Sequence, residues 1–333
     1  QSVEKINELL NQNTKDYTID NLFINDKTIG GAELANLFNT FFVEIGSSTY
    51  CHEAANRIPR LSHTMYLQPT SVPEVTMLYQ KLRNSRSRDV DDLEIKPIKY
   101  VIDLIAPVLT HIYNAAISTG LFPDSMQVAR VSVIYKNGDK NSLSNYRPVS
   151  ILPVFSKGLE KVINCRIEKF ITKYNLLTDH QFGFRKGRCT ETALLVQKEE
   201  ILHNFEDKVM TLGIFLDFSK AFDRVNHSFL FEKLEHYGLR GTVLQLIKSY
   251  LKTRYQYVEL NKCKSHLRPI EYGVPQGSIL GPILFLFYIN DIVRIYKDCK
   301  YIIYADDFSV LLEGRDLETI TRKGDTFCHY LQI

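Results

Sequence analysis

The chain has 333 residues, of which 44% are hydrophobic and 24% charged, and its net charge is +3. This is the composition of an ordinary globular protein, long enough for two domains or one large interleaved domain, and the net charge is too small to indicate a partner. The six cysteines are widely spaced, with no Cys-x-x-Cys and no histidine pair at zinc spacing. This pattern argues against a structural metal site and favours reduced, intracellular thiols.

The sequence gives no sign of a membrane segment. The longest apolar run that we identify, residues 279–289, is too short to span a bilayer and contains Pro282. We find no signal peptide and expect no membrane partner. Because residue 1 is Gln rather than Met, we expect the chain to be cut from a longer polypeptide.

The hydrophobic periodicity predicts an α+β fold, in which helices pack on a small, mostly antiparallel sheet. Residues 1–60 are interpreted as helices with a polar interruption, and 31–46 has the clearest helical spacing. The later predicted helices are residues 73–84, 98–120, 156–174, 227–239, 241–253 and 278–296. The predicted strands are residues 129–136, 210–218, 256–260 and 267–273, followed by a hairpin at 300–314.

Basic residues concentrate in the middle of the chain. Between Arg130 and Thr190 there are twelve Lys or Arg and four Asp or Glu. Such a block can be a phosphate-facing surface or the solvated face of a helix, and charge alone does not decide between the two.

Three aspartates at strand ends form the main functional signal. Asp306 and Asp307 lie at the tip of the predicted hairpin, where two adjacent carboxylates repel each other and are costly to desolvate. Asp217 ends another apolar strand about ninety residues earlier. If the strands are neighbours, the three carboxylates converge, and oxygen ligands without Cys or His favour magnesium over zinc. Taken alone, "ADD" is more simply a turn with solvated aspartates.

A glycine-rich loop lies between these aspartate motifs. In "YGVPQGSILGPILF", residues 272–285, Gly273, Pro275 and Gly277 shape a tight turn that opens a helix. Free backbone N–H groups and the Gln276 amide can approach a ligand closely there. A glycine-rich turn is a weak signal by itself, but its position between two carboxylate motifs makes it a strong one.

In combination, "LDFSKAFD" (216–223), "GVPQGSILGP" (273–282) and "YADD" (304–307) resemble the A, B and C motifs of reverse transcriptases. Residues 145–163 and 181–194 are similar to the non-LTR (LINE) retrotransposon branch, of the jockey or chicken-repeat type. Residues 34–46 resemble the segment that those elements carry between their endonuclease and polymerase. The resemblance covers nearly the whole chain.

The resemblance implies a right-hand polymerase with fingers and an antiparallel palm sheet packed by helices. It places a helical connector at residues 1–75, fingers with interleaved palm helices at 76–205, and a palm truncated at its C-terminal end at 206–333. The thumb is expected to be missing, since the chain stops at Ile333 soon after the aspartate pair. An endonuclease domain is expected upstream in the full-length polyprotein.

The resemblance also implies residue roles. Asp217, Asp306 and Asp307 would be the catalytic carboxylates that bind two Mg²⁺ ions, with Mn²⁺ as a possible substitute. The residues expected at the nucleotide are Lys136, Arg147, Phe222, Gln276 and Gly277, with Phe222 excluding a 2′-hydroxyl. Those expected at the template backbone are Arg185, Lys186 and Arg188. Without the family, Phe222 is more simply a core aromatic residue, and the basic residues are surface charge.

The implied function is that of an RNA-directed DNA polymerase, which adds deoxynucleotides to a primer 3′-hydroxyl on an RNA template in non-LTR retrotransposition. Its partners would be template RNA, a DNA primer and deoxynucleoside triphosphates, inside the cell and, by family analogy, in the nucleus. One alternative is a truncated, inactive remnant that only binds RNA or primer–template. Another is an RNA-dependent RNA polymerase, a class that usually has Gly before the aspartate pair and against which Phe222 argues.

One further departure from the family lies in a predicted loop at residues 85–95. Relatives usually have Asp-Gly where this chain has Asp91 and Asp92. Glycine adopts positive φ freely, whereas aspartate tolerates it less well.

Overall fold

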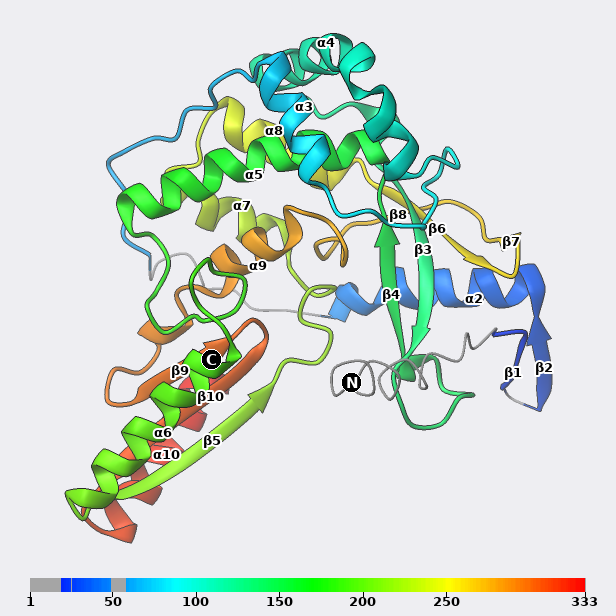
Figure 1. Ribbon diagram of the computed structural model, residues 1–333. Coiled ribbons are helices and arrows are strands. Elements are labelled where there is room, and N and C mark those ends of the chain that lie inside the picture. Colours follow the sequence, from blue (N-terminus) through cyan, green and yellow to red (C-terminus); the bar gives the residue numbers. More distant parts are fainter. Residues whose placement is uncertain (1–18, 25, 49–57, 333) are drawn as a thin grey trace, which may run out of the picture.

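The computed structural model describes residues 19–24, 26–48 and 58–332, and it confirms the α+β class. A body of helices lies at the top of Figure 1. A three-stranded sheet lies below it on one side, and a second sheet with helix α2 lies on the other.

The three-stranded sheet has the order β5-β10-β9 and is antiparallel throughout. Its strands are β5 (Met210–Asp217), β9 (Lys300–Tyr304) and β10 (Asp307–Gly314). Helix α10 (Leu317–Gln332) covers one face, where Phe327 packs with Ile303. Helix α6 (Thr190–Glu206) covers the other face, where Ala193 packs with Ile302. The sequence therefore identified these strands correctly, and pairing through β10 brings both aspartate motifs to one end of the sheet.

The second sheet has the order β4-β3-β6-β7, with β8 also paired to β6. Its strands are β3 (Val128–Tyr135), β4 (Tyr146–Ile151), β6 (Tyr255–Leu260), β7 (Cys263–Lys264) and β8 (Arg268–Pro269). The pairing of β3 with β6 is parallel, and the other pairings are antiparallel. Helix α2 (Gly31–Glu44) buries Leu34 and Phe38 in a core shared with Val131 and Val258 of this sheet.

The helical body contains the largest hydrophobic core of the described chain. Its helices are α3 (Val72–Lys81), α4 (Ile95–Thr119), α5 (Val154–Tyr174), α7 (His227–His236), α8 (Thr242–Lys252) and α9 (Gly281–Ile289). Gly120 ends α4 in the left-handed conformation, with φ +72°. By length and composition alone, α4 is apolar enough to cross a membrane. The expectation that no segment reaches that length was therefore wrong, although Ile102 and Tyr113 on one face of α4 pack in this core.

Several predicted elements differ from the structure. Within the described part of residues 1–60, strands β1 (Asn21–Ile24) and β2 (Lys27–Gly30) form a hairpin before α2, where helices were expected. The helix predicted at 278–296 is only α9 and a separate 3₁₀ turn, Ile292–Arg294. The strand predicted at 267–273 is reduced to the two residues of β8. Strand β4 and helix α6 were not predicted.

Candidate active site

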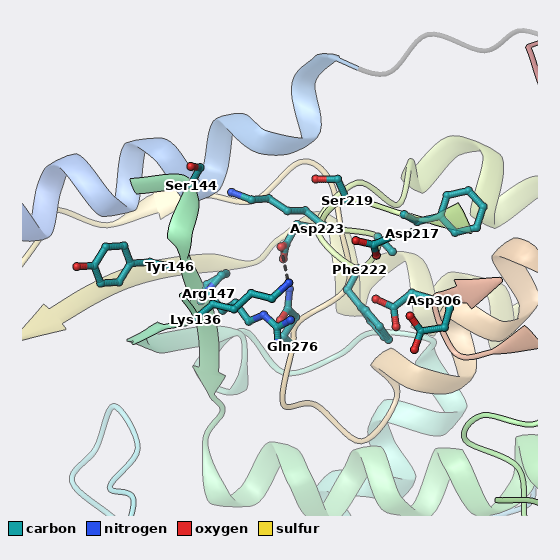
Figure 2. Close-up of a pocket in the computed structure, with 15 residues that line it drawn as sticks. Lys136, Ser144, Tyr146, Arg147, Asp217, Ser219, Phe222, Asp223, Gln276 and Asp306 are labelled. Atoms are coloured by element: carbon teal, nitrogen blue, oxygen red, sulfur yellow. Dashed lines mark hydrogen bonds between the residues drawn. The ribbon is translucent and has the colours of Figure 1, made fainter. Parts of the chain in front are cut away.

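A cleft of about 490 Å³ opens between the ends of the two sheets (Figure 2). Four segments contribute to it: the ends of β3 and β4, the loop after β5, the loop before α9 and the β9–β10 turn. Its walls are Lys136, Ser144, Tyr146, Arg147, Pro148, Asp217, Phe218, Ser219, Lys220, Ala221, Phe222, Asp223, Gln276, Asp306 and Asp307. Most residues singled out from the sequence thus line one cleft, and the exceptions are Gly277 and the three basic residues at 185–188.

The carboxylate wall is set by strand pairing. Asp307 is the first residue of β10 and lies directly opposite Asp217, the last residue of β5. Asp306 occupies the two-residue turn between β9 and β10, together with Ala305. Burial raises the pKa of Asp306, and the nearby carboxylates of Asp307 and Asp217 raise it further. The backbone hydrogen bond of Asp306 and the positive charge of Arg147 act in the opposite direction.

The chemistry of this wall suits hard divalent cations. Within residues 19–24, 26–48 and 58–332, none of Asp217, Asp306 and Asp307 forms an ion pair with a basic side chain. Mutually repelling carboxylates in one cleft are stabilised by Mg²⁺-type ions, which take oxygen ligands. Over the same residues, however, no three His, Cys, Asp or Glu side chains already converge tightly enough to form a metal site. The three carboxylates that could bind metal thus line the cleft, but they do not form a preassembled metal site.

The opposite wall is cationic. Arg147 lies on β4, opposite Ile134 of β3, and Lys136 directly follows β3. The main-chain N–H of Lys136 donates to the Asn145 carbonyl over 2.8 Å, so the β3–β4 ladder continues as far as Lys136. Both side chains are exposed, and among the described residues neither has an ion-pair partner. Figure 2 shows Arg147 and Lys136 facing the carboxylates across the cleft.

The loop before α9 joins the two walls. The Gln276 carbonyl accepts the main-chain N–H of Ser150 on β4 over 2.7 Å. The Gln276 side-chain Nε2 donates to Asp223 Oδ2 over 2.8 Å, as the dashed line in Figure 2 marks. Gly277 has φ +110°, and a Cβ there would lie 2.6 Å from the Ser150 carbonyl oxygen. Gly277 is thus required for the close approach of this loop to β4. Its neighbour Gln276 lines the cleft, whereas Gly277 does not.

Phe222 lies in the centre of the cleft wall. Its ring stacks on Phe285 of α9, with centroids 4.5 Å apart, and meets the edge of Phe184 at 5.9 Å. It is also partly exposed to the cleft. The ring is therefore anchored by the buried Phe285 and lines the cleft as well, and its role at a nucleotide sugar stays a prediction.

The three basic residues expected at the template lie outside this cleft. Arg185 donates to the Thr178 carbonyl over 2.6 Å, and Arg188 donates to Asp179 Oδ1 over 2.7 Å. Both arginines therefore stabilise their own loop. Lys186 is exposed. A template role for these residues stays a prediction, and Lys186 is the one whose charge is not used within the loop.

The sequence analysis missed Asp223 and Glu160. Asp223 belongs to the quoted "LDFSKAFD", and its membership of that motif was the available signal. Burial raises the pKa of Asp223 to about 6, while the Gln276 hydrogen bond and Lys220 lower it. Glu160 on α5 is fully buried, and its Oε2 accepts the main-chain N–H groups of Ile279 and Leu280. Glu160 thus holds the loop that carries Gln276, a role that no local pattern indicates.

Comparisons with known proteins agree with this site. Residues 134–330 match the family described as reverse transcriptase (RNA-dependent DNA polymerase), and the chain belongs to that family. It is 31% identical over 290 residues to a probable RNA-directed DNA polymerase from transposon X-element of Drosophila melanogaster. It is 32% and 34% identical to the RNA-directed DNA polymerases from mobile element jockey of Drosophila melanogaster and Drosophila funebris.

These matches cover 85%, 77% and 74% of this chain, respectively, but only 32%, 29% and 28% of the relatives. The chain therefore spans about a third of the length of the relatives that it matches. The recognition of a non-LTR reverse transcriptase from the sequence motifs is confirmed.

Proposed function

We propose that this chain is the RNA-directed DNA polymerase module of a non-LTR retrotransposon protein, adding deoxynucleotides to a primer 3′-hydroxyl on an RNA template. The observation that carries the proposal is the pairing of Asp217 with Asp307 at the mouth of a cleft whose far wall holds Lys136 and Arg147. A nucleoside triphosphate is an anion that needs cations on both sides. Lys136 and Arg147 supply positive charge on one side of the cleft. The carboxylate wall can present positive charge on the other side only through bound metal ions.

In this proposal, the β5-β10-β9 sheet is the palm, and strands β3 and β4 belong to the fingers. Strand β6, which comes from the 206–333 segment, pairs with β3. The domain limits expected from the sequence, 1–75, 76–205 and 206–333, remain part of the proposal. Helix α2 shares a core with Val131 of β3 and Tyr146 of β4, which supports close association of the first segment with the fingers.

The residue roles follow from the cleft. Arg147 offers a planar fork and Lys136 a point charge to the phosphate oxygens of an incoming nucleotide. Gln276 is held between Ser150 and Asp223, so its amide is fixed where it can meet the nucleotide. Phe222 would block a 2′-hydroxyl. Lys186 is the best-placed template contact, through a salt-dependent interaction with phosphate.

The three aspartates would hold two Mg²⁺ ions, which supply activation of the 3′-hydroxyl and neutralisation of the leaving pyrophosphate. The chain's own part is to orient the triphosphate and to bring the carboxylates to one strand end. Burial raises the pKa of Asp306, and repulsion from Asp307 and Asp217 raises it further. Bound cations would reduce that repulsion.

The test is primer extension on an RNA template with Mg²⁺ and deoxynucleotides, comparing the parent chain with Asp306→Ala. The matched control is Asp325→Ala, which removes an exposed carboxylate on α10 that does not line the cleft. We expect extension by the parent and the control, and a loss of at least about a hundredfold in Asp306→Ala.

Each other outcome has a separate meaning. Equal extension by Asp306→Ala would overturn the assigned roles. No extension by the parent, with salt-sensitive RNA binding retained, would identify a remnant that only binds nucleic acid. A preference for ribonucleotides would identify an RNA polymerase instead.

A further inference from the structure

The turn that carries the aspartate pair is supported by a segment far away in the sequence. Gln181 forms a parallel bridge with Ile303 of β9. Around it, the Ile303 N–H donates to the His180 carbonyl over 2.9 Å, and the Phe182 N–H donates to the Ile303 carbonyl over 2.7 Å. This segment thus adds a short strand to the outer edge of the three-stranded sheet, beside the strand that leads into the turn.

The Gln181 side chain reaches past this bridge to the turn itself. It is buried, with 2% of its surface exposed. Its Oε1 accepts the main-chain N–H of Ala305 over 3.0 Å and that of Gly183 over 2.8 Å. Its Nε2 lies 3.5 Å from the Ala305 carbonyl oxygen. The amide therefore contacts both main-chain polar groups of the residue directly before Asp306.

Gly183 allows this contact. A Cβ at Gly183 would lie 2.2 Å from the Ala305 nitrogen, which is far inside van der Waals contact. The two chains can approach this closely only because one of them has no side chain at this point.

The turn needs such support for two reasons. Ala305 has φ +58°, a conformation that costs an L-residue roughly 1–2 kcal/mol. The next two residues are carboxylates, which repel each other and Asp217. Both effects favour opening of the turn, and the hydrogen bond from the Ala305 N–H to Gln181 Oε1 opposes it.

We propose that Gln181 is a positioning residue that fixes the Ala305–Asp306 turn and so holds Asp306 and Asp307 opposite Asp217, ready for divalent cations. The cation-binding part rests on the proposed function, whereas the fixing of the turn does not. Gln181 touches neither substrate nor metal in this scheme, and it acts through the backbone of Ala305.

The principal variant is Gln181→Met, which keeps the length of the side chain and removes its hydrogen bonds to Ala305 and Gly183. The matched control is Asn204→Leu, which removes another buried amide, one that bonds Thr211 at the opposite end of β5. Gln181→Asn is shorter by one methylene and serves as a milder variant if Gln181→Met does not fold.

The first readout is amide hydrogen exchange resolved at Ala305. We expect about tenfold faster exchange in Gln181→Met, the value of one hydrogen bond, with parental exchange in Asn204→Leu. Unchanged exchange in Gln181→Met, or in Gln181→Asn if only that variant folds, would overturn the proposal.

The second readout is the Mn²⁺ dissociation constant, followed by the paramagnetic signal of the free ion. We expect it to rise about tenfold in Gln181→Met and to stay parental in Asn204→Leu. A flexible turn with unchanged Mn²⁺ affinity would refute the positioning role. If the parent binds no Mn²⁺, the proposed function fails, and exchange at Ala305 still decides whether Gln181 holds the turn.

Discussion

Replacing Asp223 with asparagine should stabilise the protein at alkaline pH. The ionised carboxylate is costly where it lies, because burial raises its pKa to about 6 despite the Gln276 hydrogen bond and the charge of Lys220. Asparagine is similar in size and keeps an oxygen that can accept from Gln276 Nε2. The variant therefore removes the desolvated charge and retains the contact between the two loops.

The size and sign of the effect follow from the pKa in the two states. The ordinary pKa of the group is 3.8, and the folded chain raises it to about 6. The folded state thus binds the proton more tightly, so this group's contribution is fully present below pH 3.8 and is lost as pH rises through about 6. The full difference between the two pKa values corresponds to about 3 kcal/mol of unfolding free energy, all of which is lost at pH values well above about 6. Since the side chain lines the open cleft and is screened there by solvent, we expect about 1–2 kcal/mol.

The assay is urea unfolding of the parent and Asp223→Asn at about pH 8 and about pH 5. The difference between the two chains isolates Asp223 from other titrating groups such as Asp306. We expect Asp223→Asn to be more stable by about 1–2 kcal/mol at the higher pH, and by about half as much at the lower pH. Asp223→Ala, which loses the acceptor, should gain less. A stabilisation that does not change with pH, or a loss of stability at about pH 8, would refute the reasoning.

Three other substitutions test separate parts of the site. Gly277→Ala should cost roughly 2–4 kcal/mol of unfolding free energy, because the new Cβ meets the Ser150 carbonyl at φ +110°; a melting temperature equal to the parent's would contradict this. Phe222→Val should lower the kcat/KM preference for deoxynucleotides over ribonucleotides by at least about tenfold, and an unchanged ratio would remove the steric role. Asp92→Gly should raise the urea midpoint by the equivalent of about 0.5–1 kcal/mol, since Asp92 has φ +58°; a lower midpoint would show that the aspartate stabilises its turn.

The sequence predicts the carboxylate end of the site well because local patterns determine it. Apolar strands that end in aspartate, and a short hairpin with two aspartates, can be recognised from neighbouring residues. What cannot be read locally is the register. The alignment of Asp217 with Asp307 depends on how β5 pairs with β10, and a shift by one residue would turn one carboxylate to the other face.

The missed and altered elements have tertiary causes. Strand β4 contains Pro148, which disfavours a strand, but β4 is an edge strand and the missing N–H costs no ladder hydrogen bond on its open side. The apolar run at 278–296 predicts a longer helix than α9, because the residues that follow α9 in this run continue the helical spacing of apolar side chains. In the structure the helix ends at Ile289, and the side chain of its C-cap, Asn290, donates to the Leu176 carbonyl and the Tyr237 hydroxyl. Such long-range contacts have no local signal.

The way in which the two walls of the cleft are joined has a consequence for their chemistry. The walls are joined by main-chain hydrogen bonds, from Ser150 to Gln276 and from Val274 to Phe222, and by the side-chain bond from Gln276 to Asp223. Over residues 19–24, 26–48 and 58–332, no ion pair crosses the cleft. The exposed charges of Arg147 and Lys136 therefore remain available to a ligand, because the fold does not use them to keep the walls in place. Substituting either one should weaken triphosphate binding with little effect on the free energy of unfolding. By contrast, Gly277 and Glu160 contribute no charge to the cleft, and changes there should alter binding only by moving its walls.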